Sequence, residues 1–284
     1  MSTSSMHVAK TGLNAQQTRM QIIANNLANV NTTGFKRDRA NFETLLYQVR
    51  RTAGDQVTAA ANLTSSFSVG TGARIVNTQK AHTQGSLLTT DNSLDLAITG
   101  DGFFTTRSAV DGTTLYTRAG SFSMSDTGHI TDSAGNRLQV FPVDANGQVT
   151  GNGISDAQVP AVNAAGSEFA GVTITETGLV QASYADGSVE PIGAVALASF
   201  ISPNGLKKVG SANWESTGLS GAASYGSPGS GAYGSLLSGA LERSNVDIAE
   251  ELVGLITAQR NFQANAKAID TATQISQTVI NLRS

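Results

Sequence analysis

The stretch MHVAKTGLNAQQTRMQIIANNLANV, residues 6–30, carries apolar side chains at alternating steps of three and four residues. The positions on this stripe are Met6, Ala9, Leu13, Gln16, Met20, Ile23, Leu27 and Val30. Such spacing is typical of a helix that packs against a second helix along a coiled-coil-like seam. We therefore predict an N-terminal helix within residues 1–35.

The C-terminal end of the chain repeats this spacing. Its stripe consists of Ile248, Leu252, Leu255, Gln259, Phe262, Ala266, Ile269, Thr273, Ser276 and Ile280. A second stripe of Ile275, Val279 and Leu282 indicates more than one helical neighbour. The sequence SNVD at residues 244–247 has the spacing of a capping box, in which side-chain oxygens accept from the free amides of a helix start. We predict a C-terminal helix over residues 244–284.

Between these ends the chain is rich in turn formers. Aspartate or asparagine precedes glycine at Asp101-Gly102, Asp111-Gly112, Asn146-Gly147, Asp186-Gly187 and Asn204-Gly205. Short alternating apolar runs lie between these dipeptides, a pattern typical of antiparallel hairpins. We predict an extended linker at residues 36–75, a β-domain at 76–218 and a Gly/Ser-rich return segment at 219–243. The expected fold class is α+β: paired terminal helices plus a discontinuous, mainly antiparallel β-domain.

Composition excludes several classes of function. The chain has no cysteine, so disulfides and thiolate chemistry are absent, and its net charge of −3 argues against nucleic-acid binding. No run approaches the roughly 18 apolar residues that a membrane helix needs, so membrane insertion is not expected. A basic region followed by an apolar region is missing at the N-terminus, so we expect no cleaved signal peptide of the Sec type.

Candidate chemical sites are weak. His7, His82 and His129 have no metal-ligand spacing. Residues 229–234 match G-x-G-x-x-G by letter, but no strand precedes them and no helix pattern follows. An arginine-rich stretch at residues 37–51 with interleaved aromatics leaves a nucleic-acid patch as a minor alternative to ion pairing between subunits. We expect no catalytic, cofactor-binding or metal-binding residues.

Four asparagines crowd residues 25–31, where they lower helix stability. One interpretation is that they end the helix, since asparagine side chains compete with the backbone for hydrogen bonds. The other is that their side chains bond between packed subunits. The sequence alone leaves both open.

Sequence blocks along the whole chain resemble the flagellar rod and hook axial protein family. The N-terminal blocks are TGLNA at residues 11–15, IANNLANV at 23–30 and TGFK at 33–36. The middle contributes LDLAI at 94–98, GFF at 102–104 and YTRAGSF at 116–122. The end contributes GALE at 239–242, SNVD at 244–247 and AQRNF at 258–262.

This resemblance implies a structural subunit that is not an enzyme and carries no cofactor. It implies a hollow helical tube that transmits motor torque and conducts exported subunits, with the terminal helices lining the channel. The implied partners are copies of the chain, adjacent rod and hook proteins, the ring bushing around the rod and the flagellar type III export apparatus. The subunit-packing residues are expected to be Leu13, Met20, Ile23, Asn25, Asn26, Leu27, Asn29, Phe35, Leu252, Leu255, Phe262, Ile269 and Ile280.

The resemblance leaves two kinds of family member possible, a distal-rod protein and a hook protein. The N-terminal half is most similar to distal-rod members, whereas residues 137–149 and 226–283 also resemble hook members without their large outer domain. In distal-rod members a segment matching residues 44–72 is implied to bridge neighbouring subunits and set stiffness. Its expected anchors are Leu45, Leu46, Tyr47, Gln48, Phe67, Gly70 and Gly72. As a single extended strip it would reach about 95 Å.

Overall fold

The computed structural model describes residues 2–51, 56–58, 61–62, 67–151 and 153–282. The chain divides into two compact units. Unit 1 comprises residues 1–28, 38–81 and 247–284, and unit 2 comprises residues 29–37 and 82–246. The N-terminal part of the chain therefore contributes to both units. The predicted α+β class is confirmed: two terminal helices pack together, and an antiparallel sheet forms the middle.

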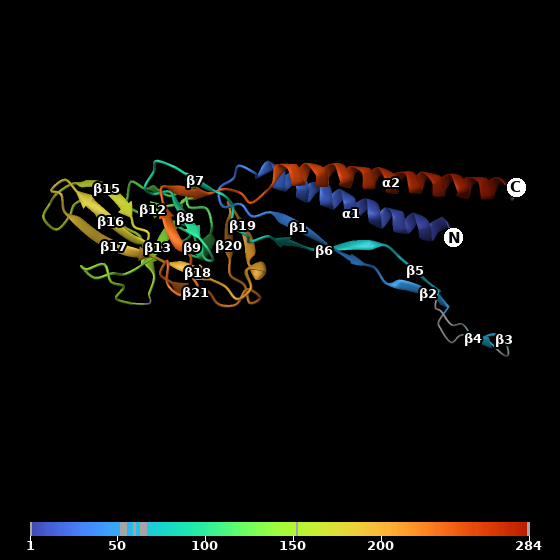
Figure 1. The fold of residues 1–284 in the computed structure, drawn as a ribbon, viewed down its shortest axis with the longest axis horizontal. Coiled ribbons are helices and arrows are strands. Elements are labelled where there is room, and N and C mark those ends of the chain that lie inside the picture. The colour runs from blue at the N-terminus through green and yellow to red at the C-terminus, as the bar shows by residue number, and fades with distance from the viewer. Residues whose placement is uncertain (1, 52–55, 59–60, 63–66, 152, 283–284) are drawn as a thin grey trace. The chain divides into compact units, whose positions relative to one another are not determined.

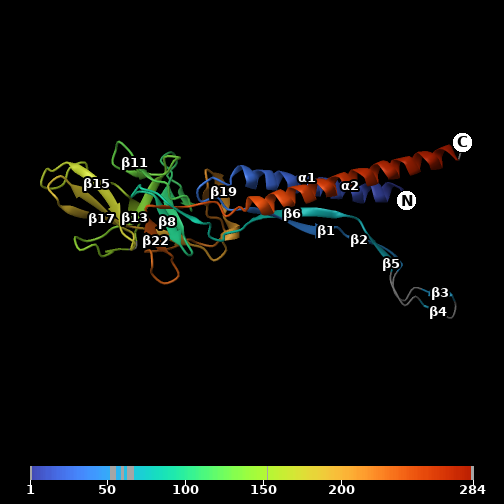
Figure 2. The same cartoon turned by 45° about the horizontal axis from the view of Figure 1, so that its top comes forward.

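Unit 1 is built on helices α1 (Ser2–Ala28) and α2 (Ile248–Asn281). They lie side by side, with the start of α1 and the end of α2 at the same end of the pair (Figure 1, Figure 2). α1 ends seven residues before the predicted limit at residue 35. α2 starts later than residue 244 because Asp247 is its N-cap and accepts from the amides of Ala249 (2.8 Å) and Glu250 (3.2 Å). Ser244 instead accepts from the amide of Val246.

Six short strands complete unit 1. They are β1 (Asp38–Thr44), β2 (Tyr47–Arg51), β3 (Gln56–Thr58), β4 (Ala61–Asn62), β5 (Phe67–Gly70) and β6 (Ala73–Lys80). They pair as nested antiparallel ladders, β1 with β6, β2 with β5 and β3 with β4. Residues 36–75 thus contain a β-ribbon that doubles back, where a single extended linker was predicted. The strands β1 and β6 also contact α1.

Unit 2 contains the remaining strands. These are β7 (Leu87–Thr89), β8 (Leu96–Thr99), β9 (Phe103–Arg107), β10 (Thr114–Thr117), β11 (Ser123–Met124), β12 (Ile130–Thr131), β13 (Arg137–Phe141), β14 (Ser155–Asp156), β15 (Phe169–Ile174), β16 (Leu179–Tyr184), β17 (Val189–Val195), β18 (Leu197–Ser199), β19 (Lys207–Gly210), β20 (Asn213–Glu215), β21 (Ser224–Gly226), β22 (Ser235–Ser238) and β23 (Ala240–Glu242), with a 3₁₀ turn at Pro203–Gly205. The strands β21, β22 and β23 occupy the predicted return segment, which is therefore part of the β-structure.

The main sheet of unit 2 is 13-stranded, with the path β15-β16-β17-β13-β9-β10-β20-β19. The ladders β8–β22 and β7–β23 lie outside it. Its largest core cluster includes the fully buried side chains of Phe104, Ile130, Leu138, Val180 and Leu197. A second cluster surrounds Trp214, the single tryptophan of the chain. Burial of these side chains gives unit 2 a hydrophobic core of its own.

One five-residue turn recurs six times in unit 2. In each copy the first residue's amide donates to the fifth residue's carbonyl, and the amide of a glycine at position four donates to the first residue's carbonyl. Each such glycine has φ between 76° and 85°: Gly128, Gly135, Gly147, Gly166, Gly178 and Gly187. This is the geometry of a type I turn followed by a left-handed residue, which suits antiparallel hairpins. The predicted Asn146-Gly147 and Asp186-Gly187 turns are two of the six.

Candidate functional site

Small residues lie where α1 and α2 approach each other most closely. Ala9 and Ala15 of α1 and Ala258 of α2 are buried. A Cβ atom placed on Gly12 would lie 2.9 Å from the side-chain amide of Asn265, and one placed on Gly254 would lie 3.4 Å from Cδ1 of Ile23. The two backbones therefore approach closely at these positions.

The predicted packing residues divide between the seam and the outside of the helices. Ile23 is buried, and the partly buried residues are Leu13, Met20, Leu27, Asn29, Phe35, Leu255, Phe262 and Ile269. Asn25 is exposed, as are Leu252 (42%) and Ile280 (67%). Leu252 and Ile280 are not covered by the other helix within one chain, and their role in packing between subunits stays a prediction. The observed seam passes through Glu251 and Ala258, which a search for large apolar side chains overlooks.

Asn26 lies in a buried polar network of unit 1. Its side chain makes a two-way bond with the backbone of Asp38, donating to the carbonyl and accepting from the amide, each at 2.9 Å. It also donates to Oε1 of Glu251 at 3.2 Å, and Asp38 pairs with Lys80 at 3.3 Å. Asn26, Asp38 and Glu251 are all buried, so losing any one of these side chains would remove hydrogen bonds that compensate for the burial of the other two. Asn26 thus joins α1, α2 and β1 within one chain, a role that neither sequence interpretation foresaw.

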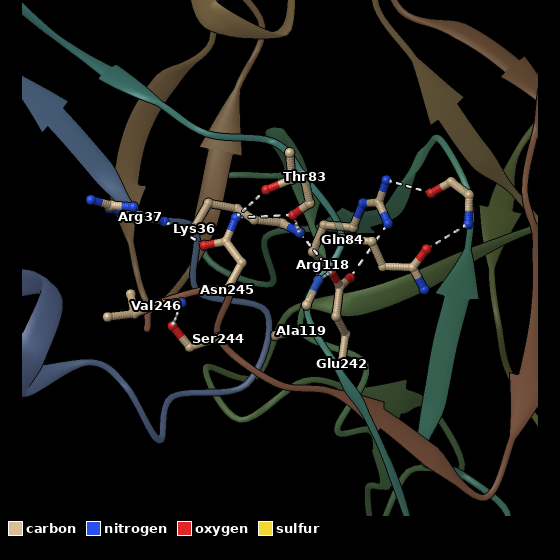
Figure 3. A network of polar contacts seen from close by, with 12 residues as sticks. Lys36, Arg37, Thr83, Gln84, Arg118, Ala119, Glu242, Ser244, Asn245 and Val246 are labelled. Atoms are coloured by element: carbon tan, nitrogen blue, oxygen red, sulfur yellow. Dashed lines mark hydrogen bonds and ion pairs between the residues drawn. The ribbon is translucent and has the colours of Figure 1, made fainter. Parts of the chain in front are cut away.

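A second buried network, in unit 2, connects blocks from both ends of the chain (Figure 3). Nζ of Lys36 lies 2.6 Å from Oε1 of Glu242 and donates to the carbonyl of Thr83 at 2.8 Å. Glu242 also accepts from the amide of Gly85 at 2.8 Å, and NH1 of Arg118 lies 3.4 Å from its Oε2. We call Lys36, Arg118 and Glu242 the charged cluster. Its members are almost completely buried, so each depends on the others for compensation.

Further contacts fix Arg118 within the cluster. Its NH2 donates to the carbonyl of Gly100 at 2.8 Å, and its guanidinium lies 5.4 Å from the centre of the Phe103 ring. Burial lowers the pKa of Arg118, and the nearby charges of Glu242 and Asp101 oppose that shift. Burial likewise lowers the pKa of Lys36, against the opposing effect of Glu242.

Asn245 adds a neighbouring connection. Its side-chain oxygen accepts from the amide of Arg37 at 2.8 Å, and its amide donates to both the carbonyl and the hydroxyl of Thr83 (Figure 3). The amide of Gly34 donates to the carbonyl of Glu242 at 2.8 Å. The blocks TGFK and GALE, more than 200 residues apart, therefore meet in unit 2 and bond through main chain and side chain alike.

The segment at residues 44–72, which we call the ribbon, bonds to itself. The amide of Leu45 donates to the carbonyl of Gly72 at 2.9 Å, and Tyr47 lies opposite Gly70. Because the chain turns back, each limb can span about 45–50 Å, half of the reach predicted for a single strip. Leu46 is 88% exposed. The side chains of Tyr47, Gln48 and Phe67 lie outside the described part of the structure.

Gly72 has φ of 122°, and a Cβ atom there would lie against Oγ1 of Thr11. That hydroxyl accepts from the amide of Ala73 at 3.4 Å. The base of the ribbon is therefore seated on α1 through a residue that must be glycine.

The described residues provide no obvious catalytic constellation. Among them, no group of three or more His, Cys, Asp or Glu side chains could hold a metal ion. His82 lies edge-on to the rings of Phe103 and Trp214. Residues 229–234 form a turn between β21 and β22, not the start of a helix. No described helix has the length and apolarity required to cross a membrane.

Three sequence families match successive parts of the chain. "Flagella basal body rod protein" matches residues 6–36, "Flagellar hook protein FlgE/F/G D1 domain" matches residues 97–182, and "Flagellar basal body rod FlgEFG protein C-terminal" matches residues 237–282. The first and third families include the blocks that meet in the two buried networks.

Two relatives are similar over nearly their whole length. The flagellar basal-body rod protein FlgG of Buchnera aphidicola subsp. Acyrthosiphon pisum is 38% identical, with 98% of this chain and 99% of the relative aligned. FlgG of Caulobacter vibrioides is also 38% identical with the same coverage. The flagellar hook protein FlgE of Borreliella burgdorferi is only 24% identical over a 441-residue alignment. These identities favour the rod over the hook.

Proposed function

The chain belongs to the family of flagellar basal-body rod proteins FlgG, and from this premise we propose that it polymerises into a hollow helical tube that transmits motor torque and conducts exported subunits. It is a structural subunit of the distal rod, and its family is not enzymatic. Self-assembly with flagellar axial proteins follows from that family.

The observation that carries the proposed tube is an exposed apolar ridge on α2. Ile248, Leu252 and Ile256 follow one another at four-residue steps, so they share one face of the helix, and Val253 lies beside them. All four side chains are exposed, and the seam with α1 leaves them uncovered. Helices of neighbouring copies would bury this ridge and add the hydrophobic stabilisation that one chain lacks.

The ribbon supports a second part of the proposal, which concerns stiffness. A rod must stay straight under torque, so neighbouring subunits must not slide. A doubled β-ribbon resists bending better than a single strand, because the ladders β2–β5 and β3–β4 hold it with backbone hydrogen bonds. With Leu46 exposed as an anchor, the ribbon would contact adjacent copies and oppose sliding.

The proposed partners are copies of this chain, adjacent rod and hook proteins and the ring bushing around the rod. We propose that the chain reaches the basal body through the flagellar type III export apparatus, without cleavage of a signal peptide. Membership of the flagellar rod family motivates this route.

Deletion of the gene tests the function in cells. The deletion strain should lose motility and should lack the hook and filament, because these assemble beyond the distal rod. The parent gene supplied in trans should restore both structures. Electron microscopy of isolated basal bodies is the measurement, and normal filaments in the deletion strain would refute the assignment.

A further inference from the structure

Two loops of unit 2 present apolar side chains to solvent at the same place. Ile201 is 95% exposed and Leu219 is 84% exposed. The loops are joined because the amide of Ser202 donates to the carbonyl of Ser220 at 3.3 Å. We call Ile201 and Leu219 the knob. The residues next to Ile201 and Leu219 in the sequence are uncharged, so no neighbouring charge explains why these apolar side chains are exposed to water.

Unit 2 also contains an uncharged pocket of about 330 Å³. Its lining residues are Phe141, Val149, Tyr225, Gly226 and Ser227. Phe141 is buried against Ala194 and Ala196. The hydroxyl of Tyr225 bonds to that of Tyr116 at 2.9 Å, which holds the ring in place. An uncharged pocket walled by Phe141, Val149 and the ring of Tyr225 suits an aliphatic side chain.

The knob and the pocket lie toward opposite ends of one strand pair. In the ladder of β18 with β21, Leu197 faces Gly226 beside the pocket, and Ser199 faces Ser224. The knob lies beyond the Ser199 end, and Ile201 is four residues from Leu197, about 13 Å of extended chain. Both belong to one sheet, so the knob of a chain cannot fill the pocket of the same chain.

We propose that the knob of one copy enters the pocket of the next copy. A protrusion that fits a pocket elsewhere on the same molecule makes a head-to-tail contact, which repeats into a helical assembly when it does not close into a ring. The occupant is a second copy of this chain because the chain carries both halves of the contact, neither half is charged, and its family self-assembles. The inference rests on the proposed polymer, and it adds a contact through unit 2 to the contacts of the terminal helices.

Crosslinking in polymers tests the contact directly. Because the natural chain has no cysteine, an Ile201→Cys chain and a Val149→Cys chain each carry one thiol. The two chains are mixed, polymerised and treated with copper phenanthroline, which accepts the two electrons as two thiols lose their protons and form a disulfide. The matched control replaces Ile201→Cys with Val110→Cys, because Val110 is 96% exposed in a different loop of unit 2.

We expect a disulfide-linked dimer from the Ile201→Cys and Val149→Cys mixture and only background from the control. A disulfide requires Cα atoms about 4.4–6.8 Å apart, so random contact gives little product. Polymers that form normally without crosslinking above the control would overturn this inference and leave the proposed function intact. Failure of the unmodified chain to polymerise would count against both.

A second pair of variants measures the contribution of the contact. Ile201→Lys combined with Leu219→Lys should raise the critical concentration for polymerisation at least tenfold, because charged side chains would enter an apolar pocket. Ser227→Phe should have a similar effect by filling the pocket. Val110→Lys should leave the critical concentration unchanged. Unchanged unfolding curves from Trp214 fluorescence would show that unit 2 is intact, and an unchanged critical concentration in both pocket and knob variants would refute the inference.

Discussion

Unit 1 and unit 2 bury their apolar side chains to very different degrees. Unit 2 encloses Phe104, Leu138 and Leu197 completely, and charged side chains within it compensate one another. Unit 1 has glycines where its helices approach closely and leaves Leu252 and Ile256 exposed. One chain therefore carries a β-unit with a core of its own and a helical unit with a row of large apolar side chains in contact with solvent. Folding and assembly should accordingly respond to different mutations.

Leu252→Asp is expected to give the largest difference between the effect on assembly and the effect on folding. The charge would be buried without a partner between helices of adjacent copies, so polymerisation should be lost. Urea unfolding of unit 2, followed by the fluorescence of Trp214, should not change, because Trp214 is the only tryptophan and lies in the core of unit 2. Sedimentation measures the polymer. The control is Val110→Asp, an equivalent change in an exposed loop of unit 2, which should change neither polymerisation nor unfolding. Normal polymers from Leu252→Asp would show that the exposed face of α2 is not needed for assembly.

Glu242→Gln should act in the opposite way, on unit 2. Lys36 and Arg118 would remain buried without their carboxylate, which costs about 3–5 kcal/mol when one member of a buried pair is removed. The free energy of unfolding, measured with urea and Trp214 fluorescence, should fall by that amount. Glu215→Gln, which removes an exposed pair with Lys207, should cost at most about 1 kcal/mol. If the two variants lower the free energy of unfolding equally, the charged cluster does not stabilise unit 2 more than an exposed ion pair does.

Asn26→Ala should produce a moderate effect confined to unit 1. It removes the hydrogen bonds to the backbone of Asp38 and to the carboxylate of Glu251, at about 1–3 kcal/mol. The critical concentration for polymerisation should rise about 5–150-fold, the factor that corresponds to this free energy. The control is Gln17→Ala at an exposed position of the same helix, which should change the critical concentration little. A shift in Trp214 unfolding would show that the effect is not confined to unit 1.

Removal of residues 47–70 should have the smallest effect on assembly and should alter only mechanics. Polymers should still form because the helices are unchanged, but they should bend more easily without contacts from the ribbon. Persistence length measured from electron micrographs is the test. Replacement of the same residues by a flexible Gly/Ser segment of equal length controls for chain length. Shortened chains that give equally straight tubes would mean that the ribbon has no mechanical role.

Periodicity and turn chemistry were sufficient to predict the two helices and the hairpins, because both depend on residues close in sequence. The phase of the seam was misjudged because the close approach at Gly12 and Ala258 needs small side chains, whereas Leu252 was weighted for its size. The doubling of the ribbon depends on pairing between β2 and β5, which residues 52–66 separate in the sequence. None of the Asp-Gly or Asn-Gly dipeptides from which hairpins were predicted lies between these strands.

The buried networks were beyond the sequence analysis for a different reason. Lys36 and Glu242 are separated by 206 positions, and no local pattern pairs residues at that distance. A signal did exist: each is the first charge after an uncharged block that contains apolar residues, at Gly34-Phe35 and Ala240-Leu241. Charges in such settings are buried only when paired, so the two blocks could have been proposed as partners.

The six recurrent turns have a consequence for the rate at which unit 2 folds. Four of them close hairpins between strands adjacent in sequence, and two close the isolated bridges Val143–Val149 and Val162–Glu168. The entropy lost on closure is therefore small, and formation should take about 1–10 μs. Pairing of β9 with β18 spans about 90 residues of chain and must wait for the ends to meet. We therefore expect substitutions of Gly135 and Gly178 to change the rates of early hairpin formation. The pairing of Phe104 with Leu197 should instead control the slow step of folding. Subunits of the axis are added one after another. Local contacts shorten the time during which unpaired strand edges of each subunit are exposed, so they reduce mispairing with other subunits.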